Sequence, residues 1–247
     1  RFKYFKNKKL RNLVSYFHID GKNQIETAMA QTVGLAGTTA KTIANRPPRL
    51  LIIAGATGTG KSTVAMKIGA KSNFARLIST DAIREILRST DETQSDSALH
   101  RSSFSVGESN DAIIDWVDTC QAVEKGIEAT INRAMREGID LLLEGVHIIP
   151  SDRLIRSWID SGGIAVGVIM AVSDEEKHKS MLKSRDAHSF RRHDRYIANF
   201  ERIRRIQDGL IERSKIASWP VVDISKVTND QEKIEYYLDL AWNQQQS

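Results

Sequence analysis

The sequence is poor in several residue types, and each shortage excludes a class of protein. Its 247 residues include one cysteine, four prolines and fifteen glycines. The single cysteine, Cys120, excludes an internal disulfide framework or a cysteine-cluster metal site and is compatible with a reducing compartment, so we expect a cytoplasmic location. So few glycines and prolines exclude a collagen-like or Pro/Gly-rich disordered chain. No apolar run approaches the roughly 18–20 residues that span a bilayer, so we expect no transmembrane segment.

Positive charge is concentrated at the amino-terminal end of the chain. The formal net charge is +5, but residues 1–48 hold nine Lys or Arg against two acids, which leaves a charge of −2 for residues 49–247. The globular part is therefore close to neutral, and the basic pI does not by itself indicate a nucleic-acid partner. A second basic stretch, residues 182–215, holds ten Lys or Arg against five acids.

Residues 1–48 form a segment distinct from the rest. Residues 1–19 contain no acid, and apolar residues within them follow the i, i+3, i+4, i+7 spacing of an amphipathic helix. We favour a docked helical extension over a basic arm for an anionic partner or membrane surface, and either over the remnant of a transit peptide. Because the chain begins at Arg1 rather than Met, we also expect an upstream piece. Pro47 and Pro48 interrupt any helix, so we place a domain boundary after residue 48 and assign residues 49–247 to one domain.

Short apolar runs alternate with helical patterns from residue 49 onward. The alternation predicts βαβ units and therefore an α/β fold, with a parallel sheet covered by helices on both faces. Residues 89–106 are polar and rich in Ser and Thr, so we expect a loop there. We expect strands at residues 49–54, 75–79, 139–143, 164–172 and 221–224. We expect helices at residues 61–71, 81–88, 108–137, 151–160, 174–217 and 230–243.

A glycine-rich phosphate-binding loop, or P-loop, follows the first expected strand. Residues 55–62 match the pattern G-x-x-x-x-G-K-[ST] and open an expected helix, which is the context that the motif requires. Glycine lets the backbone approach a polyphosphate closely, and the helix N-terminus adds partial positive charge. We expect Lys61 to contact the β- and γ-phosphates of ATP and Ser62 to ligate Mg²⁺. The expected nucleotide-binding residues are Gly55, Ala56, Thr57, Gly58, Thr59, Gly60, Lys61, Ser62 and Thr63. The agreement of strand, loop and helix disfavours a glycine-rich turn without function.

The remaining features separate the classes of P-loop protein. GTPases need an N-K-x-D motif to read the base, and the sequence lacks one. Motor ATPases carry adjacent acids after a hydrophobic strand, whereas the third expected strand is followed by a single acid, Glu144. Glu144 is a candidate for the Mg²⁺ shell or for orienting the attacking group, and the alternative is a solvated side chain at a strand end. These features favour a small-molecule kinase.

An acid and an arginine, Asp81 and Arg84, follow the second expected strand. Open α/β sheets bind ligands at the carboxyl ends of their strands, and residues three apart share a helix face. Asp81 is thus a candidate base for the acceptor hydroxyl and a candidate contact for the metal, while Arg84 is a candidate anchor for an anionic group of the acceptor. The D-x-x-R arrangement resembles that of adenylylsulfate kinases, polynucleotide 5′-hydroxyl kinases and zeta-type toxins. The alternative is an Asp that caps the helix, with an Arg on the surface.

Arginines cluster between the fourth and fifth expected strands, where P-loop kinases carry a helical, arginine-bearing lid. Such a lid supplies cationic stabilisation to the transferring phosphoryl group in a site closed to water. We expect Arg185 and Arg192 to act in catalysis, and Arg191 and Arg195 to bind the acceptor. For each of these arginines the alternative is a place on a solvated helix face.

Several motifs occur together in a fixed order. They are residues 55–63, 78–88 (I-S-T-D-A-I-R-E-I-L-R), 99–104 (L-H-R-S-S-F), 144–150 (E-G-V-H-I-I-P) and parts of 195–207. In this order they resemble the 2-phosphoglycerate kinases of the P-loop kinase superfamily, over roughly residues 49–230. In that family ATP phosphorylates the 3-hydroxyl of 2-phosphoglycerate to give 2,3-bisphosphoglycerate, and the resemblance implies the same reaction here. A P-loop kinase of this kind is expected to have five parallel strands in the order 2-3-1-4-5.

A small phosphorylated acid as substrate needs neutral hydrogen-bond donors as well as arginines. His100, Ser102, Ser103 and His147 border the expected acceptor site, and we assign them to acceptor binding. The alternatives are a polar surface loop for the first three and a structural turn for His147.

Two other functions stay open on the sequence alone. One is a nucleic-acid 5′-hydroxyl kinase, in which the basic residues 1–11 would grip the strand. The other is a non-catalytic, nucleotide-dependent binding module that uses the same arm for an anionic partner. Salt-dependent affinity for nucleic acid would favour either of them. A nucleic-acid partner is not expected, although the basic arm keeps it open, and we make no prediction of oligomeric state.

Overall fold

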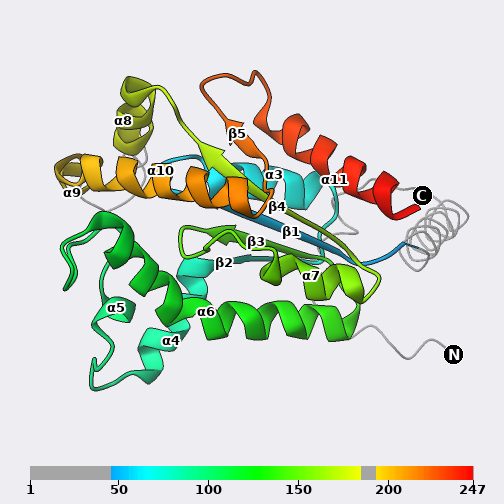
Figure 1. The fold of residues 1–247 in the computed structure, drawn as a ribbon, viewed down its shortest axis with the longest axis horizontal. Helices are drawn as coiled ribbons and strands as arrows, with labels where there is room; N and C mark the ends of the chain where they lie inside the picture. Colours follow the sequence, from blue (N-terminus) through cyan, green and yellow to red (C-terminus); the bar gives the residue numbers. More distant parts are fainter. Residues whose placement is uncertain (1–45, 185–192, 247) are drawn as a thin grey trace, which may run out of the picture. The chain divides into compact units, whose positions relative to one another are not determined.

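The computed structural model describes residues 46–184 and 193–246 of the chain (Figure 1). The chain divides into two units between Arg46 and Pro47, and the strands and helices named below belong to the second unit. The expected helical extension over residues 1–48, apart from its last three residues, lies outside the described residues.

A five-stranded parallel sheet forms the centre of the described fold. In chain order its strands are β1 (Arg49–Gly55), β2 (Arg76–Ser79), β3 (Leu141–Gly145), β4 (Ile164–Ala171) and β5 (Val221–Asp223). They lie in the order β2-β3-β1-β4-β5, so the predicted order 2-3-1-4-5 is confirmed. In β1, Leu50 pairs with Leu141 of β3 and with Ala165 of β4. These inner strands are continuous apolar runs because both faces of the sheet are covered.

Helices connect the strands and pack on the sheet. In chain order they are α3 (Lys61–Lys71), α4 (Thr80–Thr90), α5 (Ser97–His100), α6 (Ala112–Glu137), α7 (Arg153–Asp160), α8 (Glu175–Ser184), α9 (His193–Ala198), α10 (Phe200–Ile216) and α11 (Asp230–Gln246). None of the helices in the described ranges combines the length and the apolar character that crossing a membrane requires.

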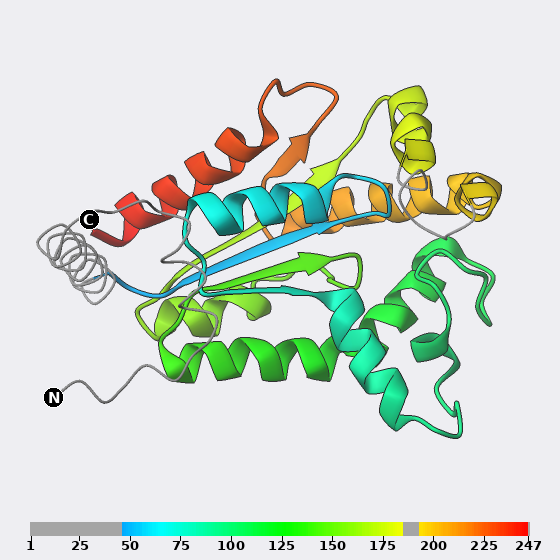
Figure 2. The ribbon, with the colours of Figure 1, turned by 180° about the vertical axis from the view of Figure 1, so that it is seen from behind.

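The two faces of the sheet carry separate apolar cores. Successive residues of a strand point to opposite faces, so Leu51 and Ile53 pack with α3 and α11, while Leu50 and Ile52 pack with α4, α6, α7 and α10. Figures 1 and 2 show α3 and α11 together along one side of the sheet and α6 and α7 along the other. The segments that follow β1, β2 and β3 all leave the sheet at its carboxyl edge, which is where open α/β folds bind ligands.

Several helix boundaries differ from the predicted ones, and three of the differences have a clear local cause or change the number of helices. The expected loop at 89–106 is wrong in one respect, because it contains α5, whose start is capped by an Asp96 carboxylate that accepts from two backbone N–H groups. Helix α6 begins at Ala112 rather than at 108 because Asp111 caps it in the same way. The expected helical stretch at 174–217 is divided, and its described part contains α8, α9 and α10.

Candidate active site

The P-loop joins β1 to α3. Gly58 and Gly60 have φ angles of +85° and +79°, in the left-handed region that favours glycine. A Cβ atom on Gly55 would lie 2.5 Å from the backbone oxygen of Met170, so β4 leaves no room for a side chain there. The glycines therefore let the loop turn back over the start of α3, where backbone N–H groups and the helix N-terminus favour an anion.

Lys61 is buried beside the P-loop. Its ammonium group donates to the backbone oxygen of Ala56 over 2.8 Å, and the hydroxyl of Thr59 donates to the same oxygen over 3.0 Å. A cavity of about 260 Å³ adjoins the loop. The cavity is lined by Thr57, Gly58, Gly60, Lys61, Ser62, Thr63, Asp81, Glu144, Gly145, Val146, Met181 and Ser184. The structure thus brings most of the predicted nucleotide-binding residues to one cavity, which we call the nucleotide cavity.

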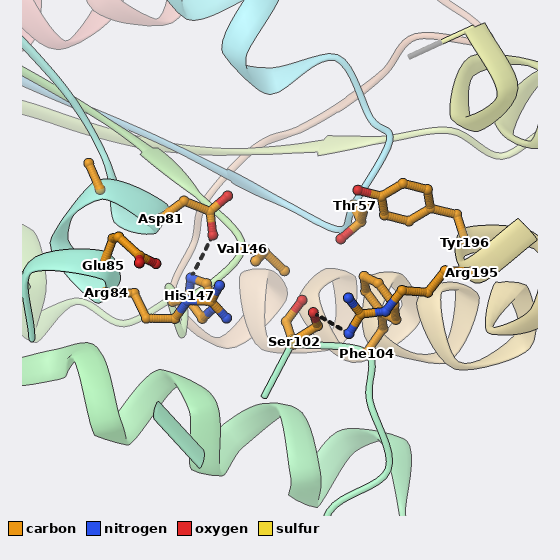
Figure 3. A pocket seen from close by; sticks show the side chains of 12 residues that line it. Thr57, Asp81, Arg84, Glu85, Ser102, Phe104, Val146, His147, Arg195 and Tyr196 are labelled. Carbon is orange, nitrogen blue, oxygen red and sulfur yellow. Dashed lines mark hydrogen bonds and ion pairs between the residues drawn. The ribbon is translucent and has the colours of Figure 1, made fainter. Parts of the chain in front are cut away.

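A larger cavity of about 570 Å³, which we call the acceptor cavity, adjoins the first. Thr57, Asp81 and Val146 line both cavities and therefore mark their common boundary. Figure 3 shows Arg84 and Arg195 on opposite sides of the acceptor cavity, with Ser102 between them. The other residues that line it are Ala82, Glu85, Ser103, Phe104, His147 and Tyr196. Two bound molecules, one in each cavity, would meet next to Asp81.

Asp81 lies in the first turn of α4, next to a buried histidine (Figure 3). Its side chain is 56% exposed, and its Oδ1 lies 3.7 Å from Nδ1 of His147, whose side chain is 1% exposed. The hydroxyl of Thr80 is 3.1 Å from the same nitrogen. Burial lowers the pKa of His147 to about 4, and the positive charges of Arg84 and Lys61 act in the same direction, while Asp81 opposes them. His147 is therefore a neutral neighbour of Asp81 at neutral pH.

The end of β3 is in direct contact with the start of α4. A Cβ atom on Gly145 would lie 2.7 Å from the Cβ atom of Thr80, closer than real Cβ contacts allow. Glycine at position 145 thus allows the chain segments that carry Asp81 and His147 to approach each other.

Oxygen ligands gather where α3 begins and β3 ends. The Ser62 hydroxyl donates to Oε1 of Glu144 over 3.0 Å, and Glu144 is only 6% exposed. Asp81 lines the same cavity. Among the described residues, no group of three or more His, Cys, Asp or Glu side chains is arranged to hold a metal ion. Mg²⁺ binds through one or two carboxylates together with waters and substrate phosphates, so this hydroxyl and these carboxylates fit it.

Two arginines reach the acceptor cavity from different helices. Arg84 of α4 donates to the backbone oxygen of Arg101 over 2.7 Å, in the loop that carries Ser102. Arg195 of α9 donates to the Ser102 hydroxyl over 2.8 Å, and its guanidinium lies 5.4 Å from the centroid of the Phe104 ring. One hydrogen bond holds Arg84, and a hydrogen bond together with the Phe104 ring holds Arg195. The planar guanidinium group suits both residues to bind a carboxylate or a phosphate.

A buried ion pair, which the sequence analysis did not single out, holds the loop at 101–111. Arg202 of α10 donates to Asp115 over 2.6 Å and also donates to backbone oxygens of the loop. Asp115 is fully buried and accepts from the N–H groups of Gly107 and Ser109. Burial alone would raise the pKa of Asp115, but the bonds from Gly107 and Ser109 and the Arg202 charge lower it to about 2. The pair therefore fixes the loop that carries Ser102 and Ser103.

Among the predicted site residues that the structure describes, four line neither cavity: Gly55, Ala56, Thr59 and His100. His100 lines neither cavity because its Nε2 lies 3.1 Å from Oδ2 of Asp91, in the turn that precedes α5. Arg185, Arg191 and Arg192 lie outside the described residues, so the roles expected for them stay predictions.

Two aromatic residues of the acceptor cavity were not predicted as site residues. The rings of Phe104 and Tyr196 have centroids 5.5 Å apart, and both side chains are almost completely buried. In a sequence, aromatic residues normally indicate a buried core rather than a site. The only signal that these two residues line a site was their place within segments that match the family motifs. Both rings line the acceptor cavity, and the Phe104 ring lies next to the Arg195 guanidinium.

The fold and the site together define a class of protein. The features of the P-loop kinase fold are a P-loop after the first strand, a parallel sheet in the order 2-3-1-4-5 and an acid in the first turn of the helix that follows the second strand. The chain belongs to the AAA domain family, whose model matches residues 50–210.

Two curated relatives of the chain share one description. The chain is 34% identical over 200 residues to the 2-phosphoglycerate kinase of Methanopyrus kandleri, covering 77% of this chain and 61% of that protein. It is 29% identical over 224 residues to the 2-phosphoglycerate kinase of Methanocaldococcus jannaschii, covering 88% of this chain and 70% of that protein. The predicted resemblance to this family is confirmed. The chain spans about three fifths of the first relative's length.

A solved structure agrees with the assignment of the fold. The crystal structure of a kinase candidate from Chloroflexus aurantiacus j-10-fl matches with a TM-score of 0.50, covering 81% of this chain and 98% of that chain. The sequence identity is 14%, so the likeness concerns the fold alone.

Proposed function

We propose that the chain is an ATP-dependent kinase that phosphorylates a hydroxyl of a small anionic acceptor. The observation that carries this proposal is the acceptor cavity, which adjoins the nucleotide cavity at Asp81 and is lined by Arg84 and Arg195. An NTPase that transfers phosphate to water needs no second cavity with anion-binding side chains beside its P-loop. The acceptor in this proposal is 2-phosphoglycerate and the product is 2,3-bisphosphoglycerate, which the similarity to archaeal 2-phosphoglycerate kinases supports.

The nucleotide cavity would take the phosphates of ATP. The N–H groups of residues 55–63 and the Lys61 ammonium would contact the β- and γ-phosphates. Ser62 and Glu144, with Asp81 nearby, would hold Mg²⁺. When bound, Mg²⁺ neutralises negative charge on the phosphate oxygens.

The acceptor cavity would take an acid with two anionic groups. In 2-phosphoglycerate the central carbon carries both a carboxylate and a phosphate, and the free hydroxyl is on the neighbouring CH₂ group. Arg84 and Arg195 lie on opposite sides of the cavity, so each would hold one anion, and the hydroxyls of Ser102 and Ser103 would donate between them (Figure 3).

Asp81 would accept a proton while the phosphoryl group passes from ATP to the acceptor. The hydroxyl oxygen of the acceptor forms a bond to the γ-phosphorus, and the bond from that phosphorus to the β,γ-bridging oxygen breaks. ADP leaves with the electron pair, and the hydroxyl proton passes to the Asp81 carboxylate and then to solvent. Arg185 and Arg192 would stabilise the transferring phosphoryl group, and Arg191 would help to hold the acceptor. The cytoplasmic location expected from the sequence stays part of the proposal.

A substrate screen with γ-labelled ATP tests this function. The purified chain would be incubated with 2-phosphoglycerate, with 3-phosphoglycerate, whose free hydroxyl is on another carbon, and with 5′-hydroxyl oligonucleotides. We expect label in 2,3-bisphosphoglycerate, and at least 10-fold higher kcat/KM for 2-phosphoglycerate than for its isomer, because one misplaced hydroxyl loses its contact with Asp81. Label in oligonucleotides instead would favour the nucleic-acid kinase, and ATP-dependent partner binding without label would favour the binding module.

A further inference from the structure

Helix α8 packs directly against the P-loop at Thr57 and Gly58. His178 in this helix is fully buried, and its Nε2 lies 2.9 Å from the backbone oxygen of Thr57. Thr57 is one of the residues that separate the nucleotide cavity from the acceptor cavity. Nothing in the motifs of the chain assigns a role to this histidine.

The chemistry of the contact fixes which nitrogen of His178 carries hydrogen. A carbonyl oxygen only accepts hydrogen bonds, so Nε2 must be the donor. Nδ1 is buried and has no hydrogen-bond partner among the described residues. Burial lowers the pKa of His178 and the charges of Arg204 and Lys61 add to this, against the Thr57 hydrogen bond. The ring is therefore neutral at neutral pH and donates through Nε2 alone.

The rest of the interface holds the ring in place. A Cβ atom on Gly58 would lie 2.8 Å from Cγ of Leu182 and 3.2 Å from Nε2 of His178, so the loop backbone packs against α8 with no space between them. The ring of Phe200 in α10 meets the His178 ring edge-on, with centroids 5.5 Å apart. On the next turn of α8, Met181 lines the nucleotide cavity.

We propose that His178 is a positioning residue for the P-loop. In a trans peptide the carbonyl and the following N–H point in opposite directions. By holding the Thr57 carbonyl on the side of α8, His178 turns the Gly58 N–H toward the inside of the loop, where the phosphates bind. The same bond seats α8 so that Met181 and Ser184 form a wall of the nucleotide cavity. This inference rests on nucleotide binding in the proposed function, but not on the identity of the acceptor.

Two variants separate the hydrogen bond from the packing. His178→Phe keeps a ring beside Phe200 and loses the donor, while His178→Gln keeps an N–H that can reach the Thr57 oxygen. Binding of ATP and of ADP would be measured by calorimetry in the absence of any acceptor, with thermal melting to check the fold. Glu176→Gln serves as a control on the same helix, because that side chain is 84% exposed.

We expect His178→Phe to raise the dissociation constant for both nucleotides about 10-fold, the effect of one lost buried hydrogen bond. His178→Gln is expected to recover most of this affinity, and Glu176→Gln to bind like the wild type. In turnover assays the KM for ATP should rise while the KM for the acceptor stays within about 2-fold. A folded His178→Phe protein with wild-type affinity, or equal losses in the Phe and Gln variants, would overturn the proposal.

A measurement on the wild-type chain covers the case in which His178→Phe does not fold. The ¹⁵N shifts of the His178 ring report which nitrogen carries hydrogen. We expect the neutral tautomer with hydrogen on Nε2, both with and without bound ADP. Hydrogen on Nδ1 would overturn the proposal, whatever the acceptor proves to be. Loss of phosphate transfer to 2-phosphoglycerate with intact ATP binding would instead count against the proposed function only.

Discussion

The Ser62 hydroxyl donates to the Glu144 carboxylate over 3.0 Å, although 82 positions separate the two residues in the sequence. One comes from the first turn of α3 and the other from the end of β3. A hydroxyl that donates its hydrogen to a carboxylate keeps its lone pairs for another partner, which is the state that a Mg²⁺ ligand needs. We therefore propose this pair as the place where the metal binds next to the P-loop.

Glu144→Gln tests that place. The amide oxygen still accepts from Ser62, so the fold should persist, but the negative charge that attracts the metal is gone. We expect the Mg²⁺ concentration for half-maximal activity to rise about 10-fold or more, as is usual when a group around a metal site is changed. Initial rates over a Mg²⁺ series at fixed ATP measure this. Glu235→Gln on α11 is the control, and a Mg²⁺ requirement that is equal in both variants would place the metal elsewhere.

Asp81→Asn tests the base. The amide cannot take the hydroxyl proton, so kcat should fall by about 10²- to 10⁴-fold, with part of the loss due to a displaced metal. Steady-state rates with ATP and acceptor varied separately measure it. Glu85→Gln changes another acid of the same cavity and is expected to lower kcat far less. A folded Asp81→Asn protein with wild-type kcat would contradict the role of Asp81.

Arg84→Ala tests acceptor binding. Arg84 would hold an anion of the acceptor in ground and transition states alike, so the acceptor KM should rise more than kcat falls, with the KM for ATP little changed. Arg84→Lys should rescue poorly, because a lysine cannot make a bidentate contact. Melting curves are needed as a check, since Arg84 also donates to the Arg101 oxygen. Equal weakening of ATP and acceptor would show that Arg84 is structural or clamps the nucleotide phosphates.

His147 makes stability depend on pH. Its pKa is about 4 in the folded chain, against an ordinary value of 6.5. Between these values the unfolded chain holds the extra proton and the folded chain does not, so the free energy of unfolding falls as the pH falls and levels off below about 4. From pH 7 to pH 5 the loss is roughly 2 kcal/mol. Urea titrations without Mg²⁺ and nucleotide measure it. His147→Gln should lose this part of the pH dependence, and an unchanged dependence would assign it to other groups.

Asp115→Asn tests the ion pair that holds the 101–111 loop. Removing the charge leaves Arg202, whose side chain is 16% exposed, without its carboxylate. Breaking a buried pair in this way costs roughly 3–5 kcal/mol of unfolding free energy. Urea unfolding gives the value. Arg205→Gln is the matched control, because its pair with Asp111 is largely exposed and should contribute less than about 1 kcal/mol. Similar losses of unfolding free energy in the two variants would mean that the buried pair contributes no more to stability than the exposed one.

The parts of the fold that could be predicted are those encoded by residues close together in the sequence. The apolar run at 49–54, the glycines of the P-loop and the acid after the second strand are local patterns, and local patterns settle the strand order once the P-loop class is known. Helix α5 was missed because a helix of four residues has no periodicity to detect. Its only signal was Asp96, which resembles any other polar residue in a loop.

The parts of the site that were not predictable depend on contacts between distant segments. Asp115 pairs with Arg202 across 87 positions, and His178 reaches the Thr57 oxygen across 121. In the sequence both look like ordinary polar residues of a helix, and only burial distinguishes them. His100 shows the opposite case, since it stands in a motif that matches the family, yet its ring faces Asp91 rather than the acceptor cavity.

The contact between Gly145 and Thr80 limits how this site can be altered. The side chain of Thr80 occupies the volume that a side chain at position 145 would need, so the two side chains cannot both be large. A larger residue at one of them demands a smaller residue at the other, and neither can change first without cost. The Thr80 hydroxyl also meets His147, so such an exchange would free the imidazole beside Asp81. A variant that changes the surroundings of His147 from this side would therefore have to replace residues 80 and 145 together.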